Sequence, residues 1–212
     1  DLRDFKSYSG YCSLAVARCE HNMGNSSSEM QALLDAARML KQDDQVNAAI
    51  SAYRHALKIA DEPLMTPIFA ELARLYISEK RFSEAAMTYA EGKLYKEAAQ
   101  CHLIVNQFEF ALDCFNKLNS SQLEPDDLVT IFLIKLYLND PMKFNFKLPI
   151  IDCHPDNDKY NDLNILLESL LTSMRSKNKD EDECRNALVD QLFPRLNGIQ
   201  NEILYKIVTN KS

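Results

Sequence analysis

The sequence predicts an all-α fold made of antiparallel helix pairs, and three observations predict it. Apolar residues recur every three or four positions along nearly the whole chain, which is the spacing of one helix face, and the alternation typical of strands is almost absent. Only four of the 212 residues are glycine, and glycine is the residue that tight β-hairpin turns favour. Prolines and helix-capping residues separate one periodic segment from the next.

The apolar periodicity divides the chain into eleven expected helices. Each range begins and ends where the three-and-four spacing of apolar residues starts and stops. In chain order, the ranges are 5–23, 29–41, 45–60, 67–79, 83–91, 94–105, 108–118, 127–139, 160–176, 182–194 and 199–209.

Capping chemistry supports several of these starts. Ser28 with Gln31, and Asp180 with Glu183, have the spacing of a capping box. Thr66 comes directly before a proline at position 67, which predicts a helix that begins there. Other prolines are expected between helices, where their missing N–H is tolerated; these are Pro63, Pro125, Pro141 and Pro155.

The first half of the chain matches a helix-pair repeat. In this template, small residues let two helices approach and large residues fill the groove between neighbours. The central copy has Phe69 and Tyr76 on its first helix and Ala85 and Tyr89 on its second, and further copies begin near positions 33 and 95. The sequence therefore predicts a tetratricopeptide-like α-solenoid of antiparallel helix pairs. Amphipathic helices in an unrelated bundle are the alternative.

Helix 127–139 differs from the others because apolar residues cover its whole circumference. A helix that is apolar all round is buried all round. It is either enclosed inside the fold or faces a partner. For the second case, the predicted partner-binding residues are Val129, Phe132 and Leu136.

The segment 140–159 contains three prolines and is the longest stretch expected to be non-helical. This segment predicts a boundary between two halves of the chain. We divide the chain into tetratricopeptide-like helical repeats over 1–139, an irregular linker over 140–159, and C-terminal helices over 160–212 that complete the same solenoid.

The motifs of enzymes and cofactor-binding proteins are absent from the sequence. It contains no GxGxxG, GxxxxGK[ST], GxSxG or HExxH pattern, and Cys153-His154 lacks a second pair of metal ligands. We therefore expect no catalytic residues, no cofactor and no metal. The six cysteines have no CxxC spacing and are expected to be buried small apolar residues in a reducing compartment.

The net charge and the apolar runs limit the kinds of partner. A net charge of −7 disfavours nucleic acid, which requires a positive surface. The longest apolar run, 129–138, is too short to cross a bilayer and contains a lysine, so we expect no direct membrane insertion.

Four segments of the chain carry a resemblance to a known family. The run Gly10-Tyr-Cys-Ser-Leu-Ala-Val-Ala-Arg-Cys19, followed by Ala32-Leu-Leu-Asp-Ala-Ala-Arg-Met-Leu40, resembles the opening helices of the 40-kDa huntingtin-associated protein family, also called the factor VIII intron 22 protein family. The segments 163–171 and 200–208 are similar to the last two helical segments of that family.

The resemblance implies a function without catalysis. Members of the family are tetratricopeptide-like solenoids that bind and stabilise huntingtin in a cleft between its HEAT-repeat arms. They also act as adaptors that link huntingtin to an early-endosomal Rab GTPase and so to endosome movement. The resemblance therefore implies an obligate huntingtin complex in the cytoplasm and at early endosomes, and it leaves a nuclear pool open.

An alternative function belongs to a different class. The chain could act without huntingtin as a vesicle-trafficking adaptor of the soluble-NSF-attachment type, which is also an irregular helix-pair solenoid. Such an adaptor usually has a basic or apolar loop that touches the membrane, and the sequence contains no such loop.

Two further groups complete the predicted partner-binding residues. Phe108 and Phe110 flank the turn into helix 108–118, and both cannot face the same core. The acidic run at the start of helix 182–194 is a candidate for contact with a basic surface, with a solvated helix cap as the alternative; it consists of Asp180, Glu181, Asp182 and Glu183.

Overall fold

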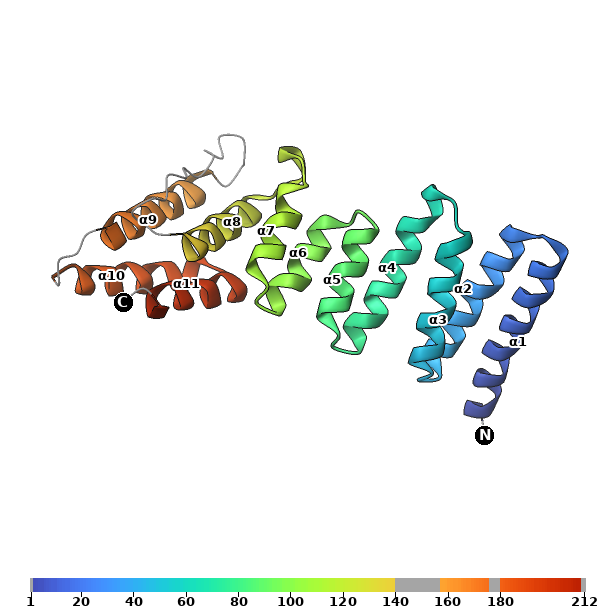
Figure 1. The fold of residues 1–212 in the computed structure, drawn as a ribbon. Coiled ribbons are helices and arrows are strands. Elements are labelled where there is room, and N and C mark those ends of the chain that lie inside the picture. The colour runs from blue at the N-terminus through green and yellow to red at the C-terminus, as the bar shows by residue number, and fades with distance from the viewer. Residues whose placement is uncertain (1, 140–156, 176–179, 211–212) are drawn as a thin grey trace. The chain divides into compact units, whose positions relative to one another are not determined.

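The computed structural model describes residues 2–139, 157–175 and 180–210 and is all-helical over these ranges (Figure 1). Within them lie eleven α-helices, one for each range that the periodicity predicts, and no strand. The chain forms two compact units, residues 1–106 and 107–212. The division between the units falls inside the range 1–139 that the sequence analysis treats as one region. The expected linker lies outside the described residues as far as position 156, and its last three residues begin a helix.

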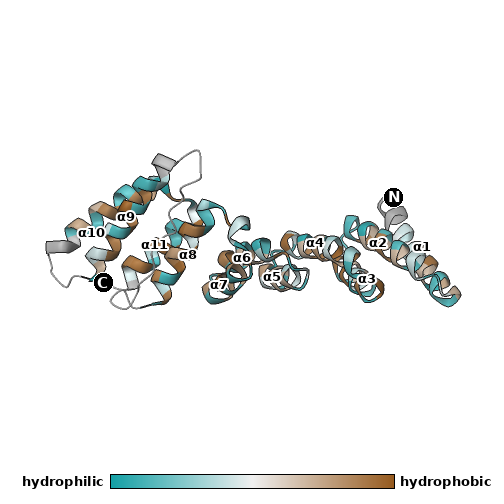
Figure 2. Cartoon of the chain, turned by 90° about the horizontal axis from the view of Figure 1, so that it is seen from above, coloured by the Kyte–Doolittle hydropathy of each residue, from teal (hydrophilic) through white to brown (hydrophobic). Residues whose placement is uncertain are grey.

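Unit 1 contains six helices. They are α1 (Leu2–Met23), α2 (Ser26–Gln42), α3 (Val46–Ile59), α4 (Glu62–Ser78), α5 (Phe82–Glu91) and α6 (Tyr95–Ile104). Each helix packs against the next one along the chain. The ribbons of α2, α3 and α4 carry both hydrophobic and hydrophilic residues, as half-buried helices should (Figure 2).

Alanine lines the helix contacts of unit 1. Because its side chain is a single methyl group, alanine lets two helix backbones approach closely without the loss of helix propensity that glycine brings. The alanines that are completely buried are Ala36, Ala37, Ala49, Ala56, Ala73, Ala85, Ala86, Ala98 and Ala99.

One turn conformation recurs after helices of unit 1. A non-glycine residue with positive φ follows α2, α4, α5 and α6: Asp44 (57°), Lys80 (58°), Lys93 (62°) and Asn106 (59°). After the first three of these helices, the next residue donates its backbone N–H to a carbonyl five positions back, as in Gln45 to Leu40 at 2.9 Å. Glycine usually fills this left-handed position, so the turn is made here without it.

Two predicted helix starts are wrong. α4 begins at Glu62, so Thr66 is not a cap and Pro67 lies inside the helix. The first four N–H groups of a helix have no intrahelical partner, so Pro63 fits in the first turn and Pro67 removes only one hydrogen bond. α2 begins at Ser26 after Asn25, and no side chain caps it. Pro125 likewise lies at the first turn of a helix, not between helices.

The described residues of unit 2 form five α-helices and two short 3₁₀ helices. They are α7 (Phe108–Asn116), η1 (Ser120–Gln122), α8 (Pro125–Leu138), α9 (Asn157–Arg175), α10 (Asp180–Leu192), η2 (Phe193–Arg195) and α11 (Gly198–Asn210). α8 packs against α7 and α11, and α9 packs against α10. None of the described helices combines the length and the apolar character that crossing a bilayer requires.

A buried glutamine joins two helices of unit 2. Gln200 is 2% exposed, and its Nε2 donates to the backbone oxygen of Asp126 at 3.0 Å and to Oγ1 of Thr130 at 3.1 Å. Its Oε1 accepts the backbone N–H of Asn197, whose side chain in turn accepts the N–H of Gln200. This reciprocal cap starts α11 and fastens it to the first turns of α8.

Candidate functional site

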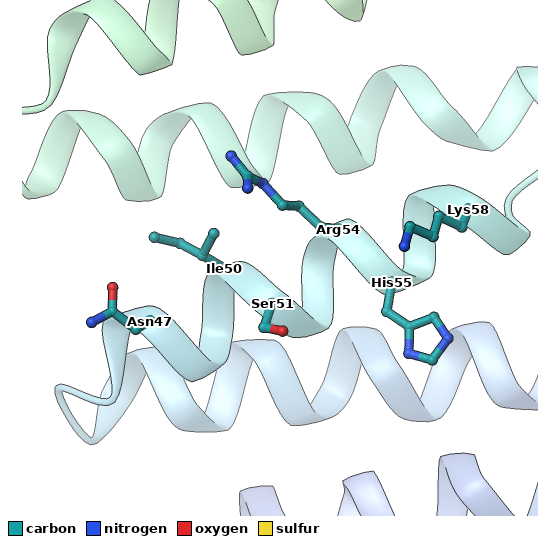
Figure 3. Close-up of a pocket in the computed structure, with 6 residues that line it drawn as sticks. All are labelled: Asn47, Ile50, Ser51, Arg54, His55 and Lys58. Carbon is teal, nitrogen blue, oxygen red and sulfur yellow. The ribbon is translucent and has the colours of Figure 1, made fainter.

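A groove of about 610 Å³ runs along the outer face of α3. Its lining residues recur at helical spacing, so they form one stripe (Figure 3). Five of them are exposed, while Ile50 is buried and forms an apolar part of the lining. The residues of this α3 groove are Asn47, Ile50, Ser51, Arg54, His55 and Lys58.

The buried residues on the opposite face of α3 determine which way the stripe of groove residues faces. Ala49, Ala52, Tyr53 and Ala56 are buried on that face, so the helix cannot rotate without exposing them. The groove residues other than Ile50 therefore point outward, because the opposite face of α3 is packed in the core of unit 1.

Two of the three basic side chains in the groove contact a buried side chain of a neighbouring helix. Arg54 donates from Nη2 to the hydroxyl of Tyr76 at 2.9 Å, and Tyr76 is only 1% exposed. The guanidinium of Arg81 lies over the same tyrosine ring, 4.8 Å from its centroid. His55 places Nε2 3.8 Å from Oε1 of Glu29. A guanidinium has five N–H donors, so Arg54 keeps several for a ligand.

Glu29 is a buried carboxylate between two exposed histidines. It is 4% exposed, and the imidazole Nδ1 of His21 lies 3.0 Å from its Oε2. With His55 on its other oxygen, this carboxylate links α1, α2 and α3. In the described part of the chain, no set of three or more His, Cys, Asp or Glu residues has an arrangement that could hold a metal ion.

A second polar network links α2, α3 and α4. Arg38 donates from Nε and Nη2 to the two oxygens of Glu71, at 3.0 and 2.7 Å, and Tyr53 donates its hydroxyl to Glu71 at 3.0 Å. The hydrogen bonds from Arg38 lower the pKa of Glu71, and Glu71 in turn raises the pKa of Arg38. Burial, reinforced by the neighbouring carboxylate, raises the pKa of the Tyr53 hydroxyl. This network holds α3 in place beneath the groove.

The predicted partner-binding residues of helix 127–139 lie in the interior of unit 2. Val129, Phe132 and Leu136 are at most 1% exposed. Of the two arrangements considered for this helix, the structure adopts the enclosed one, because α7 and α11 cover α8. In this conformation the three side chains are not a surface that a partner could contact.

The two predicted phenylalanines of α7 do point in different directions. Phe108 is buried, its ring meets that of Tyr137 edge to face at 5.2 Å, and Lys206 lies over it at 5.1 Å. Phe110 is 58% exposed. In the predicted acidic run, Glu183 is exposed, whereas the side chains of residues 180–182 lie outside the described residues. These predicted residues do not form one site.

The outer face of α1 is an apolar stripe that the sequence analysis missed. The large side chains of this α1 stripe, Tyr8, Tyr11, Val16 and Met23, are each at least 50% exposed. Cys12 and Cys19 are exposed on the same stripe, so the expectation of buried cysteines is wrong for them and for Cys184, and correct for Cys101 and Cys114. The sequence does contain a signal for this stripe, because apolar residues recur every three or four positions on a second face of α1.

The α3 groove was missed for a different reason. Single basic residues at intervals on an amphipathic helix have the pattern of an ordinary solvated face. One feature of the sequence could have indicated the groove. The range of α3 contains Arg54, His55 and Lys58 but no aspartate or glutamate, although the net charge of the chain is −7.

A scan of protein-family models and a search of curated proteins give no match to this chain.

Proposed function

We propose that this chain is a non-catalytic interaction subunit with a tetratricopeptide-like α-solenoid architecture. Two features of unit 1 support this architecture. Buried alanines lie at the close helix contacts, and the same left-handed turn recurs at Asp44, Lys80 and Lys93. Recurrence of one turn and one kind of contact is typical of folds built by stacking similar helix pairs.

We further propose that the partner is a huntingtin-like HEAT-repeat protein, and that the complex has an adaptor role at early endosomes. The first two of the four segments that resemble the huntingtin-associated family lie on α1 and α2, which pack together. Gly10, from the first stretch, lies so close to Leu40, from the second, that a Cβ at position 10 would come within 2.9 Å of the leucine side chain. The resemblance therefore includes residues that determine how these two helices meet.

The observation that carries the proposal is the α1 stripe. Large apolar side chains that are exposed together on one helix face often mark an interaction site, because ordinary protein surfaces rarely have such a patch. Tyrosine and methionine are also enriched in protein interfaces. A partner that covers this face would remove Tyr8, Tyr11, Val16 and Met23 from water.

Co-purification tests the proposal. We expect the chain, co-expressed with huntingtin, to co-elute from size-exclusion chromatography at about 0.5 M NaCl, because salt does not screen an apolar interface. Val16→Asp should abolish co-elution. The matched control is Met87→Asp, which places the same charge on an equally exposed apolar position of α5.

Two results would contradict the proposal. One is a soluble monomer that does not co-elute with huntingtin. The other is co-flotation of the chain with liposomes in the absence of huntingtin, which would support the vesicle-trafficking adaptor instead.

A further inference from the structure

We propose that the α3 groove binds an extended acidic peptide segment of a protein partner. The groove lies on a different helix from the α1 stripe, and the proposed huntingtin interface does not require it. It would therefore be a second binding site on this subunit.

The charge of the groove determines the kind of ligand. Arg54 and Lys58 lie one helical turn apart on a helix that carries no acidic residue, and His55 lies between them. The neighbouring carboxylate of Glu29 is buried and already contacts two imidazoles. In the described ranges, no carboxylate pairs with the ammonium group of Lys58. An incoming carboxylate would therefore meet cations that are exposed and aligned.

The spacing of the groove fits an extended chain. A helix rises ~1.5 Å per residue, so the eleven steps from Asn47 to Lys58 span roughly 16 Å, or about five residues of extended peptide. The four steps from Arg54 to Lys58 span about 6 Å along the helix axis, close to the ~6.6 Å between alternate residues of an extended chain. A Glu-x-Glu sequence would place both carboxylates opposite these two cations. Asn47 and Ser51, also four residues apart, would bond to the peptide backbone.

The shape of the groove favours a peptide over a membrane or a nucleic acid. Arg54 and Lys58 form a single row along the groove, whereas a bilayer surface is flat and requires a broad basic patch. The whole chain has a net charge of −7, which disfavours binding to a large anionic surface. A narrow acidic segment meets the cations without requiring a broad basic surface around them.

Fluorescence anisotropy with the full chain tests the proposal. The probe is the fluorescein-labelled pentapeptide Glu-Ala-Glu-Ala-Glu, and the peptide control is Gln-Ala-Gln-Ala-Gln. At about 50 mM NaCl we expect the acidic probe to bind and the neutral one not to bind, with affinity falling as salt increases. Lys58→Glu should weaken binding roughly five- to tenfold, since it replaces an attraction with a repulsion. Arg54→Gln should weaken it several-fold.

Arg18→Glu is the matched control for Lys58→Glu. It makes the same change of charge at an exposed position of α1, and we expect its affinity to stay within about twofold of the wild type. Circular dichroism of both variants establishes that they are folded. The proposal is overturned if the acidic probe does not bind to the folded protein, or if Lys58→Glu binds it like the wild type.

Two further comparisons complete the test. Equal binding of the neutral peptide would overturn the proposal, and so would binding to phosphatidylserine vesicles without binding to the acidic probe. The assay contains no huntingtin, so a failure of this proposal and a failure of huntingtin co-elution are separate results.

Discussion

The two units of the chain bury their apolar surface in different ways. Unit 1 brings its helices together through alanines, and each helix packs against its neighbour in sequence. Unit 2 surrounds one helix, α8, whose large side chains are almost completely covered; these include Phe132, Leu133, Ile134 and Leu136. Most of the largest fully buried side chains of the described residues belong to unit 2. Stability should therefore be distributed along unit 1 and concentrated at one helix in unit 2.

The polar contacts differ in the same way. In unit 1, Glu71 joins three helices through a partly exposed ion pair with Arg38 and a hydrogen bond from Tyr53. In unit 2, the amide of Gln200 joins α8 to α11 through neutral hydrogen bonds inside the fold. A charged contact responds to pH, and a neutral amide does not. The two units should therefore respond differently both to core mutations and to acid.

The largest expected effect is the loss of a ring from the centre of unit 2. Phe132→Ala removes a side chain that is 1% exposed and leaves a cavity among its neighbours. Such truncations destabilise proteins by about 3–5 kcal/mol. Hydrogen exchange followed by mass spectrometry should show faster exchange in peptides from 107–212, with a much smaller change in peptides from 1–106.

Phe110→Ala is the matched control on α7. This side chain is 58% exposed, so its removal should change stability by less than about 0.5 kcal/mol. If Phe132→Ala accelerated exchange equally in both units, the contrast drawn between them would be incorrect.

The number and order of the described helices could be predicted from apolar periodicity, because most of them bury one stripe of their own residues. Helix ends were less predictable. Pro67 could not be recognised as an interior residue, since the sequence does not show that the chain is already helical from Glu62. The role of Gln200 was also not predictable, because its partners lie 70 and 74 residues earlier in the sequence.

The candidate site was predicted less well than the fold. An all-apolar helix such as α8 has the same sequence pattern whether its cover comes from the same chain or from a partner. The sequence alone could not decide between these. Val129 and Phe132 were predicted to bind a partner in the second case, and the structure buries them. The α3 groove depends on which face of the helix the alanines bury, and this is a property of the packed structure.

An intermediate effect is expected at the close contact between α4 and α5. A Cβ at Gly92 would come within 2.7 Å of the Cβ of Phe69, which the backbone of α4 holds in place. Gly92→Ala should therefore destabilise unit 1 by about 1–3 kcal/mol through overpacking. Thermal unfolding by circular dichroism measures this, and a variant as stable as the wild type would show that α4 and α5 can separate without loss.

The neighbouring position should respond in the opposite direction. Lys93 has a φ of 62°, a conformation that disfavours a side chain but not glycine. Lys93→Gly relieves this strain and loses only an exposed ion pair with Glu62, so we expect a gain of about 0.5–1 kcal/mol. Opposite signs at adjacent residues would show that close packing, and not flexibility, explains the glycine at position 92.

A pH-dependent effect is expected in the response of unit 1 to acid. The pKa of Glu71 is lowered from its ordinary value of 4.5 by hydrogen bonds from Arg38. A carboxyl group with a lowered pKa in the folded state contributes stability above its unfolded pKa, and loses that contribution as the pH falls through its folded pKa. This stability should therefore be present at neutral pH and decline below about pH 4.5. Glu71→Gln should lower stability at pH 7 by about 1 kcal/mol and reduce its dependence on pH in the acid range.

Gln200→Ala tests whether that pH dependence belongs to the charged contact of unit 1. The substitution removes the neutral amide of unit 2 and should lower stability by about 1–3 kcal/mol, because buried groups on α8 lose their partner. No proton is gained or lost by an amide in this range, so its effect should be the same at pH 7 and at pH 4. Urea unfolding at a series of pH values compares the two variants. If Gln200→Ala flattened the acid dependence as much as Glu71→Gln, the dependence would not arise from Glu71.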